Sequence, residues 1–233
     1  MGANAQTSVP AFTSGQVLTA AQVNQINTGI PVFASSTERD AAFGGTGEKT
    51  LAEGQYAFLE DTNETLVYDG SSWVSTGGKI LQVLQTVKTD VFSASSSAGV
   101  AVAVTGLTVT ITPSSSSNKV LVTVNLSNSY GVSDRQGIII TRGGSTLTGA
   151  IGDSAGSRQQ ATAVGTDAGY TPGQGLQSFT YLDSPASTSA LTYGVSLLGI
   201  DSRTHFVNRS QADTDDVTHF RTASFITVME VSA

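Results

Sequence analysis

The chain has no cysteine among its 233 residues. This absence excludes disulfide bonds, thiolate zinc sites and cysteine nucleophiles together. Charged residues are also scarce, at 12%, and the net charge is −7. Because binding to phosphates needs clustered lysine and arginine, this balance argues against a nucleic-acid partner. The hydrophobic residues, at 39%, are sufficient for the chain to bury a core.

Long apolar runs are missing as well. No stretch approaches the ~20 residues that a membrane-spanning helix needs. The first ten residues are polar and lack the basic start and apolar run of a signal peptide. We therefore expect a soluble protein made in a cytoplasm, without a membrane partner. Helix signals are few, and the many Ser, Thr, Gly, Ala and Val residues favour strands and turns.

The clearest strand signal lies between residues 107 and 127. Apolar residues alternate with threonines from Leu107 to Thr112, and apolar residues alternate again from Val120 to Leu126. Pro113 ends the first strand, and the polar stretch Ser114 to Asn118 predicts a loop between neighbouring strands. Since an isolated pair of strands is marginal in water, further strands must cover its apolar face.

Strand signals recur from Lys79 onward at the spacing of an all-β sandwich or barrel. Gly143-Gly144 predicts a two-residue hairpin loop, whereas residues 149–175 form a Gly/Ala/Ser/Thr-rich excursion with little strand signal. We count roughly eight strands in this part and no convincing helix. The expected strands outside the central stretch are residues 80–87, 100–104, 137–142, 145–148, 178–182, 191–198 and 224–231.

A smaller β unit precedes this part, over residues 33–78. It is acidic, and its phenylalanines, tyrosines and single tryptophan supply a small aromatic core. Asp69-Gly70 predicts a hairpin turn, and Gly77-Gly78 is the best boundary in the chain. The expected elements are a helical turn at residues 36–40 and strands at residues 56–59, at residues 65–68 and from Trp73.

The first 32 residues are polar with scattered apolar positions. Thr19 and Gln22 have the spacing of a capping box, which predicts a helix of about ten residues ending at Gly29. A helix this short is unstable alone, so either the segment is disordered or a partner holds it. The apolar residues available for anchoring are Val9, Phe12, Val17, Leu18, Val23 and Ile26.

An acidic cluster near the C-terminus is the best candidate for an ion site. Asp213, Asp215 and Asp216 lie close together in the sequence, and carboxylate oxygens at that density could hold Ca²⁺. The glycine and the distant glutamate of an EF-hand are missing. The other interpretations are a solvated acidic turn and a network paired with Arg209 and Arg221. We expect the turn and no bound metal.

Catalytic signatures are missing. His205 and His219 are the only histidines, so a metal site would need a carboxylate or a second subunit. No Gly-x-Ser-x-Gly elbow occurs, and two histidines leave little room for a serine triad. No isolated carboxylate pair suggests a glycosidase, and the glycine-rich stretches do not lead from a strand into a helix. We expect neither an enzyme nor a cofactor.

Two stretches resemble proteins of tailed bacteriophages. The end of the chain, from Phe206-Val-Asn-Arg-Ser through Asp213-Thr-Asp-Asp to Ser224-Phe-Ile-Thr-Val-Met-Glu-Val, is similar to the C-terminal end of a recurring virion-protein domain. The interior resembles that domain at Thr112 to Val122 and at the Arg142-Gly-Gly hairpin. Residues 36–73, ending in Tyr68-Asp-Gly-Ser-Ser-Trp, resemble a small β module of phage tail and fibre proteins.

The resemblance implies a structural virion appendage rather than an enzyme. Phage fibres of this kind are trimers with jelly-roll-like terminal domains around a three-fold axis. We therefore predict a homotrimeric tail or head fibre, with residues 1–32 attached to another virion protein. Residues 33–78 would be a β spacer, and residues 79–233 a distal jelly-roll-like antiparallel β-sandwich that binds a host-surface glycan or protein. The alternatives are a capsid decoration or cement protein and a depolymerase of host polysaccharide.

The last strand is the predicted contact between subunits. Ser224 to Val231 has apolar residues on both faces, which an edge strand facing water would not have. The expected trimer contacts are Phe225, Ile226, Val228, Met229 and Val231.

Overall fold

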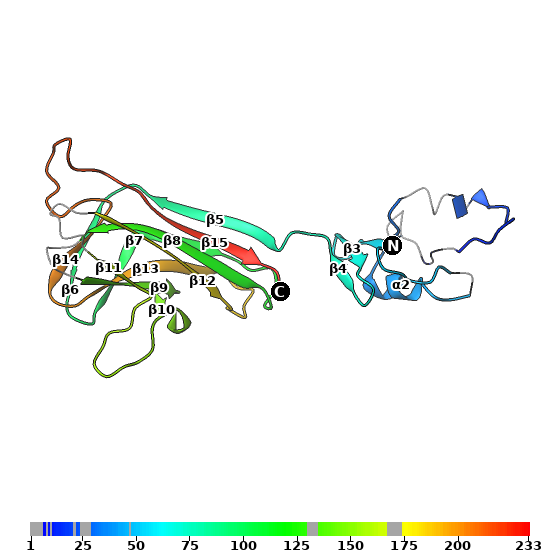
Figure 1. Ribbon diagram of the computed structural model, residues 1–233, viewed down its shortest axis with the longest axis horizontal. Coiled ribbons are helices and arrows are strands. Elements are labelled where there is room, and N and C mark those ends of the chain that lie inside the picture. The colour runs from blue at the N-terminus through cyan, green and yellow to red at the C-terminus, as the bar shows by residue number, and fades with distance from the viewer. Residues whose placement is uncertain are drawn as a thin grey trace. The chain divides into compact units, whose positions relative to one another are not determined.

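The chain divides into two compact units, residues 1–78 and residues 79–233, with the division at the Gly77-Gly78 pair. Figure 1 shows the computed structural model, which describes residues 7, 9, 11–20, 22–23, 29–46, 48–129, 135–166 and 174–233. Strands are the main regular elements of the chain, which confirms the predicted fold class. Within the described ranges, no helix is long and apolar enough to cross a membrane.

The N-terminal unit contains one four-stranded sheet and a one-turn helix. The helix α2 (Ser36–Ala41) begins after Ser35, whose side chain accepts a hydrogen bond from the Glu38 amide at 3.3 Å. The sheet order is β1-β2-β3-β4, with β1 parallel to β2 and the other pairs antiparallel. These strands are β1 (Val32–Phe33), β2 (Tyr56–Leu59), β3 (Glu64–Tyr68) and β4 (Trp73–Ser75).

The C-terminal unit is a sandwich of two antiparallel sheets (Figure 1). The first sheet contains β5 (Ile80–Lys88), β6 (Phe92–Ser96), β8 (Lys119–Ser129), β12 (Gly175–Asp183), β14 (Arg203–Val207) and β15 (Ser224–Val231). The second sheet contains β7 (Ala101–Ile111), β9 (Arg135–Arg142), β10 (Ser145–Thr146), β11 (Ala163–Thr166) and β13 (Leu191–Gly199). A short 3₁₀ turn, η1 (Thr148–Ala150), follows β10.

The strand order of the sandwich is that of a jelly roll. In the first sheet, β5 pairs with β15, and β6 pairs with β14. Both β15 and β14 pair with one side of β8, and β12 pairs with its other side. In the second sheet, β10 and β11 share β9, followed by β13 and β7. Each sheet therefore has four strand positions, and the chain crosses repeatedly between the sheets, at β6–β7, β7–β8, β8–β9, β11–β12, β12–β13 and β13–β14. This arrangement confirms the predicted jelly-roll-like sandwich.

One detail of the prediction is wrong. The two strands around the serine loop do not pair with each other, because β7 pairs with β13 while β8 pairs with β15 and β12. The loop from Ser114 to Asn118 instead crosses from one sheet to the other. A crossing buries the apolar face of each strand against the opposite sheet, which a flat pair could not do.

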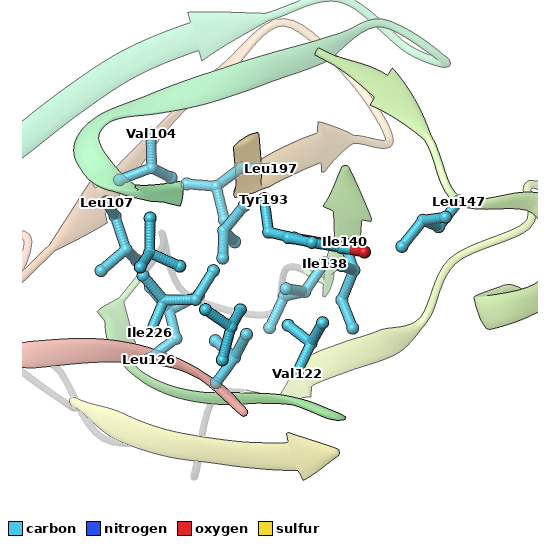
Figure 2. Packing of buried hydrophobic residues seen from close by; sticks show 14 of the residues in the cluster. Val104, Leu107, Val122, Leu126, Ile138, Ile140, Leu147, Tyr193, Leu197 and Ile226 are labelled. Carbon is cyan, nitrogen blue, oxygen red and sulfur yellow. The ribbon is translucent and has the colours of Figure 1, made fainter. Parts of the chain in front are cut away.

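The core lies between the two sheets, as Figure 2 shows. The first sheet contributes the inward side chains of β8 and β15, and the second sheet contributes those of β7, β9 and β13. The fully buried contributors include Leu107, Ile111, Val122, Val124, Leu126, Ile138, Ile140, Leu197, Ile226 and Val228. These side chains alternate with outward ones, so each strand contributes to the core with one face.

A buried polar cluster joins the sheets at the edge of this core. Asp183 accepts hydrogen bonds from the Tyr193 hydroxyl at 2.7 Å and from Arg142 at 2.6 Å. Burial and the neighbouring Asp183 carboxylate raise the pKa of Tyr193. The three groups come from β12, β13 and β9 and satisfy one another, so their role is structural.

Glu230 holds the serine loop in place. Its carboxylate is buried and accepts hydrogen bonds from the Ser114 amide at 2.7 Å, from the Ser114 hydroxyl at 2.7 Å and from Asn118 at 2.6 Å. Gln82 donates a further one. Burial alone would raise the pKa of Glu230, but the hydrogen bonds from Asn118, Gln82 and Ser114 outweigh it and lower the pKa to about 2.

We predict that Glu230→Gln destabilises the C-terminal unit by about 1–3 kcal/mol, because an amide group then faces donors. The lowered pKa makes the Glu230 contribution complete above its ordinary pKa of 4.5 and progressively lost as the pH falls towards 2. The free energy of unfolding, measured with urea between these pH values, should therefore depend less steeply on pH in the variant than in the wild type. The exposed Asp153→Asn control should leave both quantities unchanged.

A second prediction tests the core. Leu126→Ala should lower the free energy of unfolding by about 2–5 kcal/mol, because the side chain is fully buried and leaves a cavity. Leu176→Ala is the matched control, since Leu176 is 66% exposed and should change the free energy by less than about 0.5 kcal/mol. Equal effects in a denaturant titration would contradict the assigned core.

Candidate functional site: the outward face of the first sheet

The outward side chains of the first sheet form an uncovered surface. On β15, the inward residues Ser224, Ile226, Val228 and Glu230 are buried, whereas the alternate residues are only half-buried. The same alternation holds along β8 from Lys119 to Leu126 and along β12 from Gly175 to Leu182. We call this surface the outward face. It consists of Val83, Gln85, Val87, Leu121, Thr123, Asn125, Ser178, Thr180, Leu182, Phe225, Thr227 and Met229.

An apolar row crosses the outward face from edge to edge. Met229 is paired with Val83 on one side and with Leu121 on the other, and Leu121 is paired with Leu182. Val83 is 55% exposed and Leu182 is 43% exposed. The row thus places four apolar side chains from four adjacent strands in water. A single exposed apolar residue needs no explanation, but a contiguous row indicates an interaction surface.

The neighbouring row is polar but uncharged. Thr227 accepts a hydrogen bond from Gln85 at 2.8 Å, and the hydroxyls of Thr123 and Thr180 lie 3.2 Å apart. None of these residues is charged, and the exposed Lys119, which is paired with Val231, lies at the border of the face. Charged residues are depleted at the buried centres of protein interfaces, so this composition is typical of a contact surface.

The outward side of the second sheet is covered by the chain in part, around Gly137 on β9. A Cβ atom on Gly137 would lie 3.0 Å from that of Leu198 and 3.3 Å from that of Ala161, so Gly137 allows residues 151–162 to pack closely there. The Thr162 amide donates to the Ile138 carbonyl at 2.8 Å. Leu198 and Ile139 are consequently buried, at 7% and 4% exposure. Over β7 this side is open, but its exposed residues Ala101, Ala103, Thr108 and Thr110 are small or polar, unlike the apolar row of the first sheet.

The predicted contact residues of β15 separate into two groups. Phe225, Met229 and Val231 are half-buried and point outward, where a second molecule can reach them. Ile226 and Val228 are fully buried in the core of their own chain, so we remove them from the contact surface. The alternation of a sandwich strand explains the correction, because one face of β15 already covers the core.

The edge strand β5 is the part of the surface that sequence reasoning missed. Its apolar residues are exposed on both faces, at 55% for Ile80, 49% for Leu81 and 48% for Val87. The apolar residues in Ile-Leu-Gln-Val-Leu-Gln-Thr-Val were visible in the sequence, and the argument used for the last strand applies to them. An uncharged edge strand of this kind is open to pairing or contact with another chain.

A scan against protein-family models and a search of curated proteins found no match to this chain.

The N-terminal anchoring residues lie in the first unit. Val9 packs against the core of that unit, its amide donates to the Ala42 carbonyl at 3.1 Å, and its carbonyl accepts from the Lys49 amide at 2.8 Å. The capping box is present, because Thr19 and Gln22 exchange hydrogen bonds, and Ala20, Gln22 and Val23 are helical. Ile26 lies outside the described residues. The exposed members of the set are Phe12, Val17, Leu18 and Val23.

The acidic cluster lies in an excursion between β14 and β15. Asp213 forms ion pairs with Arg221 and, at 3.3 Å, with Arg209, and the Arg221 hydrogen bond lowers the pKa of Asp213. Asp216 accepts hydrogen bonds from Thr218 and then His219, which lower its pKa to about 2. Asp215 is exposed. The carboxylates face different partners, and in the described ranges no group of three His, Asp or Glu residues could hold a metal.

The excursion is held at its base by a buried asparagine. Asn208 is fully buried with a positive φ of 61°, and its side-chain amide donates to the Lys88 carbonyl at 2.8 Å and to the Asp90 carbonyl at 3.0 Å. Its side-chain oxygen accepts from the Ser224 hydroxyl at 2.7 Å. Asn208 thereby joins the start of the excursion, the start of β15 and the β5–β6 bend. His205, the other histidine, is buried with its Nε2 2.9 Å from the Ser96 hydroxyl.

We predict that EDTA leaves the melting temperature unchanged, because the arginines already neutralise Asp213. A bound Ca²⁺ would instead stabilise the folded chain by about 2.7 kcal/mol at a hundredfold excess over its dissociation constant. Thermal unfolding with added CaCl₂ and then with excess EDTA measures the difference. A large drop with EDTA would make the excursion a metal site.

Proposed function

We propose that the chain is a structural protein of a tailed-phage virion, assembled as a homotrimeric tail or head fibre. The observation that carries the self-association is the outward face, which is crossed by an apolar row and uncovered by its own chain, while the number of three subunits follows from the resemblance to phage fibres. A second copy of the chain is the natural cover, since symmetric self-association buries the same apolar surface on every subunit. The resemblance of the two sequence stretches to phage proteins supports the virion assignment.

The path of the chain through the C-terminal unit supports a distal binding end. Residues 79 and 232 are joined by a 2.8 Å hydrogen bond, so the chain enters and leaves at the same end of the sandwich. The excursion of residues 208–223 lies toward the opposite end, where β5 ends at Lys88 and β15 begins at its partner Ser224 (Figure 1). In the proposed fibre, residues 1–32 attach to another virion protein, and the end with the excursion binds a host-surface glycan or protein.

We predict a trimer at micromolar concentration and its loss in Leu121→Lys. Leu121 lies in the middle of the apolar row, so the variant would bury an unpaired charge in the subunit contact. Light scattering after size exclusion should give three times the chain mass for the wild type and a lower mass for the variant. Circular dichroism should show that the variant keeps its strands, because residue 121 points away from the core.

The matched control is Ala103→Lys on β7. This residue is exposed on an edge strand of the second sheet, so the same charge should not change the mass. A wild-type monomer, or a Leu121→Lys variant that remains a trimer, would refute the assigned contact.

Labelling of intact virions with an antibody against the chain tests the virion assignment. Label at tail or head appendages is expected. Label only at capsid lattice points would favour a decoration or cement protein, and clearing of host polysaccharide by the purified chain would favour a depolymerase.

A further inference from the structure

The N-terminal unit contains an open cavity that the proposed spacer role does not use. Its volume is about 540 Å³, a size suited to a small-molecule ligand. Its lining has an apolar part, which we call the wall, and a polar part, which we call the rim. The apolar wall consists of Phe43, Leu51, Tyr68 and Trp73. The polar groups are the side chains of Asp40, Thr50, Ser71 and Ser72.

The aromatic wall is held in place before any ligand arrives. Trp73 is half-exposed, with its ring centroid 5.9 Å from that of Phe43 and 5.5 Å from that of Tyr68. The guanidinium of Arg39, which is 7% exposed, lies 4.8 Å from the Trp73 ring centroid and pairs with Asp40 at 2.7 Å. The rings are tilted against one another, by 47° and 57°, and each fixed ring offers a ligand an apolar surface at little entropic cost.

The hairpin turn determines which hydrogen-bonding groups the rim presents to a ligand. Asp69 accepts hydrogen bonds from the amides of Ser71 at 2.9 Å and Ser72 at 2.8 Å, which lower its pKa to about 2. Both serine hydroxyls also donate to this carboxylate. Their protons are therefore engaged, and their oxygen lone pairs remain as acceptors. With the Asp40 carboxylate, the rim presents acceptors, and no lysine or arginine is among the lining residues.

The chemistry of this cavity selects its ligand. A ligand must place an apolar face on the aromatic rings and donate several hydrogen bonds to the rim. The rim offers an anion no partner, because Arg39 is already paired with Asp40 and no lysine or arginine lines the cavity. A pyranose ring meets both requirements, with its C–H face on an aromatic ring and its hydroxyls at the edge.

We propose that this cavity binds a neutral saccharide. The inference goes beyond the proposed function, which assigns host-surface binding to the C-terminal unit and only a spacer role to residues 33–78. It is also independent of the trimer, because the cavity belongs to the N-terminal unit alone.

Trp73 is the only tryptophan in the chain, so intrinsic fluorescence reports on this cavity directly. The full chain is titrated with maltotriose, cellotriose and triacetylchitotriose, and with sialyllactose as an acidic probe. At least one neutral sugar should change the emission saturably at millimolar concentration, and sialyllactose should not. Tyr68→Ala should weaken that binding about tenfold, which corresponds to ~1.4 kcal/mol.

Two further variants keep the test decisive. Ser72→Ala removes one rim acceptor while the 2.8 Å bond from its amide to Asp69 preserves the turn, so it should weaken binding even if Tyr68→Ala fails to fold. Tyr56→Ala is the matched control, because Tyr56 is 46% exposed on the same sheet outside the cavity and should leave binding unchanged.

Three results would overturn the proposal. They are no response to any neutral sugar, equal weakening by Tyr56→Ala, or a response to sialyllactose alone. A proline-rich peptide that changes the emission when the sugars do not would assign the cavity to a protein partner instead. None of these results bears on the Leu121→Lys experiment, so the two proposals fail separately.

Discussion

A β-sandwich buries one face of each sheet, and the other face must be matched to water, covered by the chain or covered by another molecule. The C-terminal unit depends on this constraint. Its second sheet is covered by the chain around Gly137, which leaves the space for Ala161, and its open part on β7 presents small or polar side chains. Its first sheet has no such cover and carries apolar residues in register across four strands. Because the two sheets share one core, the asymmetry directs association to a single side of the molecule.

Buried polar side chains hold the long connections that a jelly roll requires. Glu230 fixes the crossing between β7 and β8 through hydrogen bonds from Ser114 and Asn118. Asn208 does the same for the excursion before β15, through the Lys88 and Asp90 carbonyls. Each accepts or donates several bonds, so its burial leaves few polar groups unpaired. These residues explain how Ser-rich and Asp-rich loops return to a defined register without disulfide bonds.

Several candidate residues have roles in the structure that differ from those predicted from the sequence. Asp213 belongs to a paired arginine network, and Ile226 and Val228 belong to the core. The aromatic residues of the N-terminal unit do more than fill a core, since Tyr68 and Trp73 also line an open cavity. A half-exposed aromatic cluster is therefore the feature of residues 33–78 that a spacer role leaves unexplained.

The sequence by itself determined the mainly β class, the unit boundary at Gly77-Gly78 and most strands, because alternation and glycine pairs act locally. The capping box at Thr19 and the helix after Ser35 were also predictable from the sequence, because they depend on neighbouring residues. Sequence did not reveal the short strands β1, β6, β11 and β14, nor that residues 101–111 form one strand where two were expected. It also did not reveal the sheet in which each strand lies. Only the tertiary structure decided that β7 and β8 lie in opposite sheets, which face of β15 is buried, and that Val83, Met229, Leu121 and Leu182 form one row. Strand pairing joins residues far apart in the chain, and no local pattern specifies which strands become neighbours.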